Sequence, residues 1–454
     1  MIRRLWTLSR RPFIRNVATV ATGTVLAQAI VVAFSPIITR LYGPEAFGVL
    51  GVFASLTAMV VPVASLTYHV AIVLPAEDED AKGLVALSLM IAAGISSLLA
   101  LVVLFFRSAV VELLQIQVVA SLIFLVPVVV FLASCTQILR QWMIRKQQYK
   151  RTAAIMVTST LSLNSTKACA GLLWPSPVIL VLLATFGNLL DSTMFAIASL
   201  RTLLAAPFKE TGRHIPSRGH IAAMAKRYRD FPTLRAPGTL LTAGSVGLPV
   251  LLLTSLFGPA PAGFYALGAR VLALPAQIIG TAIGDVFYPR IAQAGNSGEN
   301  VQRLIVRATL GLAALGLVPY GVVVAFGPWL FGFVFGSEWV AAGEFGRWLA
   351  MWMFFMFINK PSTVAIPVLD IQGFGLVFNI VMIVARVAAL FGGYAMWGSA
   401  LVAISLYCIA GVVLNAVLIL IVIVKSGKGV VRRQVAPVDA EACSQDLSEP
   451  KVDS

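Results

Sequence analysis

Charged residues are scarce in this chain. Asp, Glu, Lys and Arg make up only 12% of its 454 residues, whereas hydrophobic residues make up 59%. A soluble domain carries about 25% charged residues, so this composition excludes a soluble globular protein and indicates an integral membrane protein. The apolar stretches are long and continuous, which favours membrane-spanning helices over the short alternating strands of a membrane barrel.

Cysteine, histidine and recognisable catalytic motifs are also rare or missing. The four cysteines lack metal-ligand or disulfide spacing, and the three histidines are widely dispersed. Neither the phosphate-binding loop Gly-x-x-x-x-Gly-Lys-[Ser/Thr] nor the pair His-Glu-x-x-His occurs. We therefore expect no metal site, no cofactor and no enzymatic activity.

Long apolar runs are what the chain does have. Each is close to the length of about twenty residues that a helix needs to cross the hydrocarbon core of a bilayer. We predict an all-α polytopic fold of about twelve spans, at 17–39, 46–66, 83–106, 116–137, 152–173, 177–200, 238–256, 263–283, 304–326, 341–367, 374–396 and 398–424.

The basic residues are distributed unevenly between the two sides of this predicted topology. Twenty-two of them lie in the N-terminal arm, in the connections after spans four and six, and after the last span. The opposite connections contribute only Arg40 and Arg107. The positive-inside rule therefore places both termini in the cytoplasm. The net charge of +15 is explained by this topology, and we expect no nucleic-acid partner.

One sequence phrase occurs in each half of the chain. Leu-Tyr-Gly-Pro-x-x-x-Gly at 41–48 returns as Leu-Phe-Gly-Pro-x-x-x-Gly at 256–263, an offset of 215 residues. This repeat predicts two pseudo-symmetric lobes around a central cavity, a plan used by secondary transporters. We expect an N-terminal six-helix lobe at 1–205, a basic cytoplasmic linker at 206–237, a C-terminal six-helix lobe at 238–424 and a disordered cytoplasmic tail at 425–454.

Several charged residues fall inside or at the edges of the predicted spans. A lone charge in hydrocarbon costs at least about 2.5–3.5 kcal/mol, so such residues normally face a cavity or a partner. Basic residues dominate this group, which favours a water-filled cationic cavity for an anionic substrate, and guanidinium groups suit phosphate well. The candidate cavity residues are Arg270, Arg347, Arg386, Arg40, Lys360 and Arg307.

Some of these charges have simpler interpretations. Arg40, Arg307 and Lys360 lie near span ends, where their side chains can reach the headgroups. Asp191 is either a site for ion coupling or a structural partner of Lys167. The acidic run Glu77–Asp80 is either a charge cluster at the start of a helix or a metal or sugar-nucleotide site.

The cytoplasmic extension of span four carries Arg140 and Arg145 on one basic face. This face is a candidate for binding a pyrophosphate or anionic headgroups, and ordinary positive-inside anchoring explains it equally.

Together, the ordered motifs of the chain resemble the polysaccharide-transport family of oligosaccharide-lipid flippases. This family, which handles O-antigen and exopolysaccharide precursors, lies in the superfamily that contains the MATE exporters and the lipid II flippases. The resemblance covers about residues 17–424, and the motifs that carry it lie at 36–48, 68–75, 140–145, 256–265, 270–275, 286–290 and 347–350.

The resemblance implies a function as well as a fold. The implied substrate is a polyprenyl-pyrophosphate-linked oligosaccharide, moved across a bacterial inner membrane by alternating access for lipopolysaccharide or exopolysaccharide synthesis. Membrane lipids and the polysaccharide polymerase and chain-length machinery are the implied partners. One departure concerns coupling: the family usually has Glu where this chain has His69, which either titrates near neutral pH or is simply buried.

Two other functions stay open. A cation-coupled drug antiporter would share the fold, but it would favour acidic residues in the cavity, and this chain has few. A membrane polysaccharide polymerase needs a substantial outer loop, whereas the predicted outer connections here are short.

Overall fold

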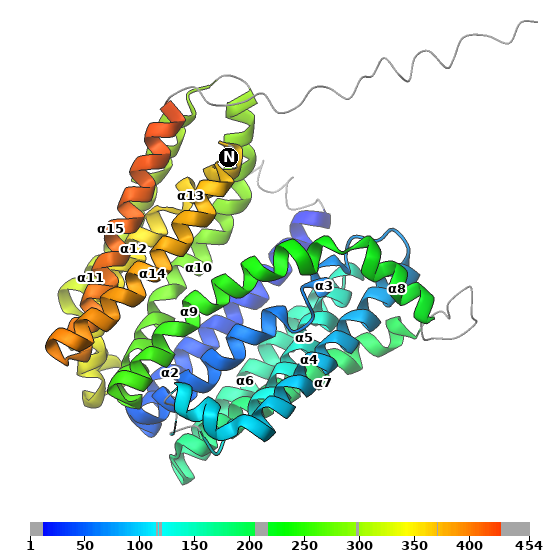
Figure 1. Cartoon of the computed structure of the whole chain (residues 1–454), viewed down its shortest axis with the longest axis horizontal. Coiled ribbons are helices and arrows are strands. Elements are labelled where there is room, and N and C mark those ends of the chain that lie inside the picture. Colours follow the sequence, from blue (N-terminus) through cyan, green and yellow to red (C-terminus); the bar gives the residue numbers. More distant parts are fainter. Residues whose placement is uncertain are drawn as a thin grey trace, which may run out of the picture. The chain divides into compact units, whose positions relative to one another are not determined.

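The computed structural model describes residues 12–114, 117, 120–204, 217–296, 299–369 and 371–427. Every regular element within these residues is a helix, which confirms the predicted all-α fold (Figure 1). The predicted tail beyond residue 427, the arm before residue 12 and the linker segment 205–216 lie outside the described residues.

The helices follow one another with short connections. In the first half they are α2 (Pro12–Val60), η1 (Val61–Val63), α3 (Tyr68–Ala71), α4 (Asp78–Leu114), α5 (Leu125–Arg145), α6 (Tyr149–Leu173), α7 (Pro177–Leu203) and α8 (Arg218–Arg227). In the second half they are η3 (Phe231–Arg235), α9 (Ala236–Phe257), α10 (Pro259–Asn296), α11 (Val301–Phe335), η4 (Ser337–Trp339), α12 (Val340–Ile358), α13 (Lys360–Val368), α14 (Gln372–Trp397) and α15 (Ala400–Gly427).

The helices account for the twelve predicted spans. In the described part of the chain, eight helices are long and apolar enough to cross a membrane, and the bent pair α12–α13 makes a ninth. Helix α2 holds two predicted spans, one on each side of Gly43, where its backbone leaves the helical conformation. Helices α6 and α10 overlap the other two predicted spans, but neither is among the helices apolar enough to cross a membrane by length and composition alone. Helix α5, which holds predicted span four, begins at Leu125, and the predicted start of that span at 116 lies outside the described residues.

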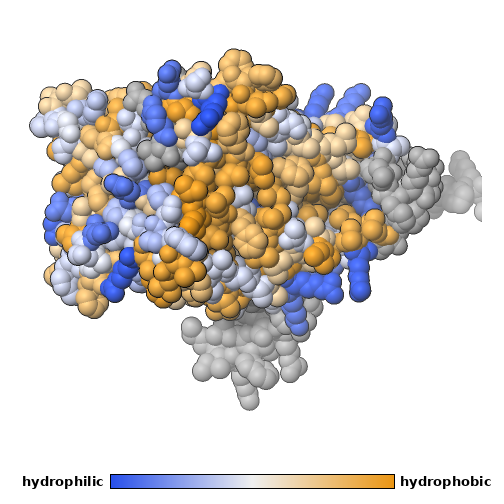
Figure 2. Space-filling view, turned by 90° about the horizontal axis from the view of Figure 1, so that it is seen from below, coloured by the Kyte–Doolittle hydropathy of each residue, from blue (hydrophilic) through white to orange (hydrophobic). Residues whose placement is uncertain are grey.

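Large apolar side chains are exposed along many of these helices, as expected for a surface that faces lipid. Apolar residues cover much of the face shown in Figure 2. Phe105, Leu172 and Ile197 are examples, with 73%, 72% and 75% of their surfaces exposed. The protein is therefore a multi-span membrane protein.

The chain forms two compact units. The first comprises Met1–Val271, Phe326–Arg347 and Gly393–Ile404, and the second comprises Leu272–Ala325, Trp348–Gly392 and Ser405–Ser454. The first unit thus takes in α9 and parts of four later helices, α10, α11, α12 and α14, together with the start of α15. The division into two six-helix lobes at 206–237 stays a prediction.

The two copies of the repeated phrase adopt the same backbone. Gly43 has φ 67° and ψ 172°, and Gly258, 215 residues later, has φ 88° and ψ 179°. A positive φ is readily adopted only by glycine, and proline is favoured at the first position of a new helix. The Gly-Pro pair therefore ends one helix and begins the next at an abrupt angle, once in each half.

The two copies also pack against each other inside the first unit. A Cβ atom on Gly48 would lie 1.8 Å from the carbonyl oxygen of Pro259, and one on Gly263 would lie 2.1 Å from that of Pro44. Each copy thus presents its glycine to the proline of the other. This reciprocity is the signature of a two-fold pseudo-symmetric contact, and it supports a duplication.

Beside this contact, an aromatic cluster closes one end of the first unit. Trp339 is 1% exposed, and its indole nitrogen donates to the carbonyl oxygen of Thr39 at 3.1 Å. The edges of Phe47 and Phe264 lie against it, at centroid distances of 5.2 and 6.1 Å. Trp339 is therefore a core residue of the turn between α11 and α12.

The linker helix α8 is docked on protein. Met224 is buried in a core cluster with Tyr68 and Leu84, and the Tyr68 hydroxyl donates to the carbonyl of Ala225 at 3.0 Å. The imidazole of His220 lies 2.8 Å from the place a Cβ on Gly83 would take. The first unit thus holds this part of the linker firmly against α3 and α4.

Alanine at Gly48 or Gly263 tests the contact between the repeats. Either Cβ collides with backbone atoms that cannot rotate away, so we expect each variant to lose about 1–3 kcal/mol of stability or more, as overpacking does. Thermal unfolding of the purified protein measures the loss. The control is Gly94→Ala on α4, where no atom lies within 4 Å of the new Cβ. Equal melting temperatures for Gly263→Ala and Gly94→Ala would contradict the tight crossing.

Candidate cationic substrate site

Two basic side chains on neighbouring helices of the first unit form the most distinctive charged pair of that unit. Lys167 of α6 and Arg270 of α10 lie close enough to repel each other electrostatically. Neither forms a salt bridge with any residue that the structure describes. Lys167 is half-buried and Arg270 is exposed, yet surrounding protein desolvates both. Protein atoms therefore lie around both charged groups, while part of each side chain remains exposed.

The local packing fixes α6 in this position. The Tyr42 hydroxyl donates to the carbonyl oxygen of Lys167 at 3.0 Å. One helical turn further on, Gly171 allows the ring of Tyr42 to approach, since a Cβ there would lie 2.7 Å from it. The end of the first helical segment of α2 thus determines where Lys167 lies.

Arg40 and Arg347 belong to the same unit. Arg40 donates to the carbonyl oxygen of Phe333 at 2.8 Å, and its stem packs on Gly336, whose φ is 112°. Arg347 is exposed and its stem lies beside Gly327, where α11 and α12 cross closely. Arg40 thus joins α2 to the turn after α11, while Arg347 is an exposed residue of α12.

Asp191 is not paired with Lys167 by a salt bridge in the described structure. The carboxyl group of this α7 residue is half-buried and shares a hydrogen bond with Ser159 of α6. A carboxyl group inside a span with a neutral partner can exchange a proton, so coupling at Asp191 stays a prediction.

Arg386, in the second unit, is enclosed by aromatic rings. Its guanidinium carbon lies 3.9 Å from the ring centre of Trp352 and 4.0 Å from that of Tyr407, whose hydroxyl it contacts. Only 7% of Arg386 is exposed. Ring faces stabilise a cation by their quadrupoles, so this environment explains the buried charge without a substrate. Trp352 is itself 8% exposed, a core residue.

The remaining predicted cavity residues lie elsewhere in the second unit. Arg307 is exposed two turns into α11. Lys360 follows Asn359, at which the chain bends by 44° between α12 and α13. Asn359 is 3% exposed and donates to Asn415 of α15 at 2.8 Å, which anchors the break. No hydrogen bond or salt bridge links Arg307 or Lys360 to Arg386 in the described residues.

On the side with most basic residues, Arg145 and the acidic run form a structural network. Arg145 donates to Asp78 at 3.1 Å and to the carbonyl of Pro75 at 2.6 Å. Asp80 receives Arg227 at 3.2 Å and lies 3.5 Å from His220. Arg145 is thus occupied in fastening the chain before α4. No group that could hold a metal occurs among the described residues. Arg140, by contrast, is half-buried and lies one turn earlier on α5.

His69 lies in the short helix α3, outside the spans, and is 9% exposed. Its Nδ1 atom is 2.7 Å from the Ser65 hydroxyl. Burial, with a further contribution from the charge of Arg235, lowers the pKa of His69 from 6.5 to about 4. The neutral imidazole therefore prevails near neutral pH, and coupling at His69 stays a prediction.

Comparison with known proteins places the chain in a family. The family model for polysaccharide biosynthesis proteins matches residues 37–344, more than half of the chain. The chain belongs to this polysaccharide biosynthesis family. The match confirms the resemblance that its motifs indicated. No curated protein matches the chain in sequence.

Solved structures of other proteins have a fold similar to that of this chain. An inward-facing multidrug resistance MATE transporter of the MOP superfamily aligns with a TM-score of 0.68 at 13% identity, covering 89% of this chain and 98% of the other. The lipid II flippase MurJ in an inward closed conformation aligns with a TM-score of 0.65 at 10% identity, covering 90% and 89%. The predicted MATE-like and MurJ-like fold is thus confirmed.

His69→Gln tests the buried neutral imidazole. Above pH about 6.5 the ring is neutral in both the folded and the unfolded state, so protonation of His69 takes nothing from the stability of the fold. As pH falls toward 4 the unfolded state takes up the proton first, and we expect about 3 kcal/mol to be lost. His69→Gln has no ring to protonate, so its denaturation midpoint should not show this loss of stability between pH 7 and pH 4. Superimposable pH curves for the two proteins would refute the shifted pKa, and Arg235→Gln should make the wild-type dependence shallower.

Proposed function

We propose that this protein flips a polyprenyl-pyrophosphate-linked oligosaccharide across the bacterial inner membrane, by alternating access, for lipopolysaccharide or exopolysaccharide synthesis. Membership of the polysaccharide biosynthesis family and the fold shared with MATE transporters and MurJ support membrane transport. The observation that carries the substrate class is the Lys167–Arg270 pair, two like charges within membrane helices that lack an acidic partner among the described residues.

The physical argument starts from the cost of this pair. One uncompensated charge in a membrane costs at least about 2.5–3.5 kcal/mol, and mutual repulsion adds to the cost of two. A pyrophosphate carries several negative oxygens on adjacent phosphorus atoms, so one group can accept hydrogen bonds from the ammonium and the guanidinium together. The anion relieves the repulsion that the empty site retains, which provides the driving force for binding.

The other predicted cations have graded roles in this proposal. Arg347 and Arg40 lie in the same unit as the pair and add to its positive charge, whereas Lys360 and Arg307 belong to the second unit. Asp191 is the preferred coupling residue, because its carboxyl group lies in a span beside Ser159. The basic side, with both termini, faces the cytoplasm as the charge distribution predicts.

A second candidate is a cation-coupled drug antiporter. The likeness to a multidrug resistance transporter and the half-buried carboxyl group of Asp191 favour it. The Lys167–Arg270 pair disfavours it, because a cationic substrate would be repelled by the same field. A polymerase is the weakest alternative, since the predicted outer connections are too short to build a catalytic domain.

Charge removal at the pair tests the proposal. We expect Lys167→Gln and Arg270→Gln to reduce polysaccharide export at least about tenfold each, since either loses a charge-assisted phosphate contact. Arg270→Lys should retain part of the activity. The lipid-linked precursor should accumulate in the cytoplasmic leaflet at unchanged protein level.

Lys226→Gln on α8 serves as the control, because Lys226 is an exposed cation outside the spans. Normal export in both single variants and in their double variant would discard the pair as the substrate site. Precursors that reach the outer leaflet but stay unpolymerised in a deletion strain would instead indicate a polymerase.

A further inference from the structure

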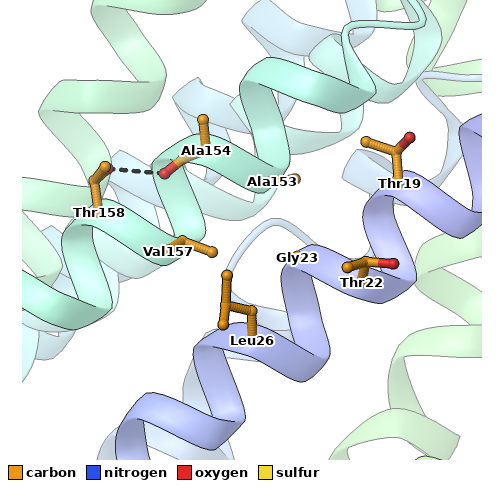
Figure 3. Close-up of a pocket in the computed structure, with 8 residues that line it drawn as sticks. All are labelled: Thr19, Thr22, Gly23, Leu26, Ala153, Ala154, Val157 and Thr158. Carbon is orange, nitrogen blue, oxygen red and sulfur yellow. Dashed lines mark hydrogen bonds between the residues drawn. The ribbon is translucent and has the colours of Figure 1, made fainter.

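A groove between α2 and α6 lies apart from the cation pair, within the first unit. It has a volume of about 640 Å³ and is open along one side. Figure 3 shows the eight residues that line it, drawn from one face of each helix: Thr19, Thr22, Gly23 and Leu26 of α2 and Ala153, Ala154, Val157 and Thr158 of α6. Its floor is formed where Gly23 meets Ala153, since a Cβ on Gly23 would lie 2.5 Å from that of Ala153.

The walls of this groove are apolar despite the threonines. Leu26 and Val157 face each other across it (Figure 3). The Thr158 hydroxyl donates to the carbonyl oxygen of Ala154 at 2.8 Å, so it presents its methyl group and keeps its proton within the helix. Hydrocarbon suits such walls better than sugar, whose hydroxyl groups need free donors and acceptors.

Two basic residues come just before the groove-lining part of α6. Lys150 and Arg151 occupy the first turn of α6 and are exposed. Lys150 stands one turn before Ala154, so the two side chains share a face of the helix. Neither cation forms a salt bridge with a described residue. The chain thus places two adjacent cations immediately before the residues of α6 that line the apolar groove.

We propose that this groove holds the first isoprene units of the polyprenyl carrier, while Lys150 and Arg151 hold its pyrophosphate before transfer to Lys167 and Arg270. This inference rests on the proposed function and adds a loading site to it. Two neighbouring cations match the adjoining phosphates of a pyrophosphate, whereas a phospholipid such as phosphatidylglycerol offers one phosphate. The groove places the carrier on the same helix, α6, that carries Lys167.

Photo-cross-linking of the full-length protein tests the occupant directly. A benzophenone amino acid replaces Thr22, an exposed residue that lines the groove, and the protein is reconstituted in vesicles with either a sugar-free polyprenyl pyrophosphate or phosphatidylglycerol. We expect the polyprenyl pyrophosphate to be captured at least about tenfold more at position 22 than at position 196. Ala196 is the matched control, an exposed alanine on α7. Equal capture at both positions, or preferential capture of phosphatidylglycerol, overturns the proposal.

Substitutions separate this inference from the proposed function. Ala154→Phe fills the groove and should lower capture of the polyprenyl pyrophosphate by the probe at position 22 about tenfold. Ala196→Phe should leave it unchanged. The double variant Lys150→Gln/Arg151→Gln should lower capture of the polyprenyl pyrophosphate. The double variant Lys167→Gln/Arg270→Gln should leave that capture unchanged but abolish polysaccharide export.

Two outcomes distinguish a failure of the groove proposal from a failure of the proposed translocation site. Normal capture after Ala154→Phe and after the Lys150/Arg151 change rejects the groove but leaves the flippase proposal standing. Capture at the groove combined with normal export in the Lys167/Arg270 variants supports the groove and rejects the cation pair as the translocation site.

Discussion

The reciprocal contact between Gly48–Pro259 and Gly263–Pro44 is the constraint on which the rest of the first unit depends. Two helices can meet at this distance only if both lack side chains where they cross, and a Gly-Pro turn is what brings each helix to the crossing at the right angle. Because the crossing joins a helix from each half of the chain, it holds the start of α10, and with it Arg270, beside α2 and α6. The position of the proposed substrate pair is a consequence of this backbone packing.

The two units accommodate the cationic side chains of their helices in different ways. In the first unit, Lys167 and Arg270 are left with each other's repulsion, and the surrounding residues fix their helices without neutralising them. In the second unit, Arg386 is satisfied by Trp352 and Tyr407. Cations in the helices thus occur in two different environments in one molecule. The Lys167–Arg270 pair has no acidic partner among the described residues, whereas Arg386 packs between aromatic rings.

Much of the fold could be predicted from the sequence because its signals are local. The length of apolar runs, the Gly-Pro turns and the basic connections each depend on a few neighbouring residues, and they identified the all-α membrane fold and the family. The site was predicted less completely. Arg270 was named from its position in a span, whereas Lys167 entered only as the partner in one of two interpretations of Asp191, because no local pattern shows that α6 approaches α10. The enclosure of Arg386 and the burial of Trp339 likewise depend on helices far apart in sequence.

The aromatic enclosure of Arg386 has an electrical consequence. The guanidinium of Arg386 lies between two rings inside the second unit, so a cationic group is held among its membrane helices. Moving one elementary charge across the full membrane field is worth about 2.3 kcal/mol per 100 mV. A displacement of α14 along the membrane normal would therefore respond to voltage.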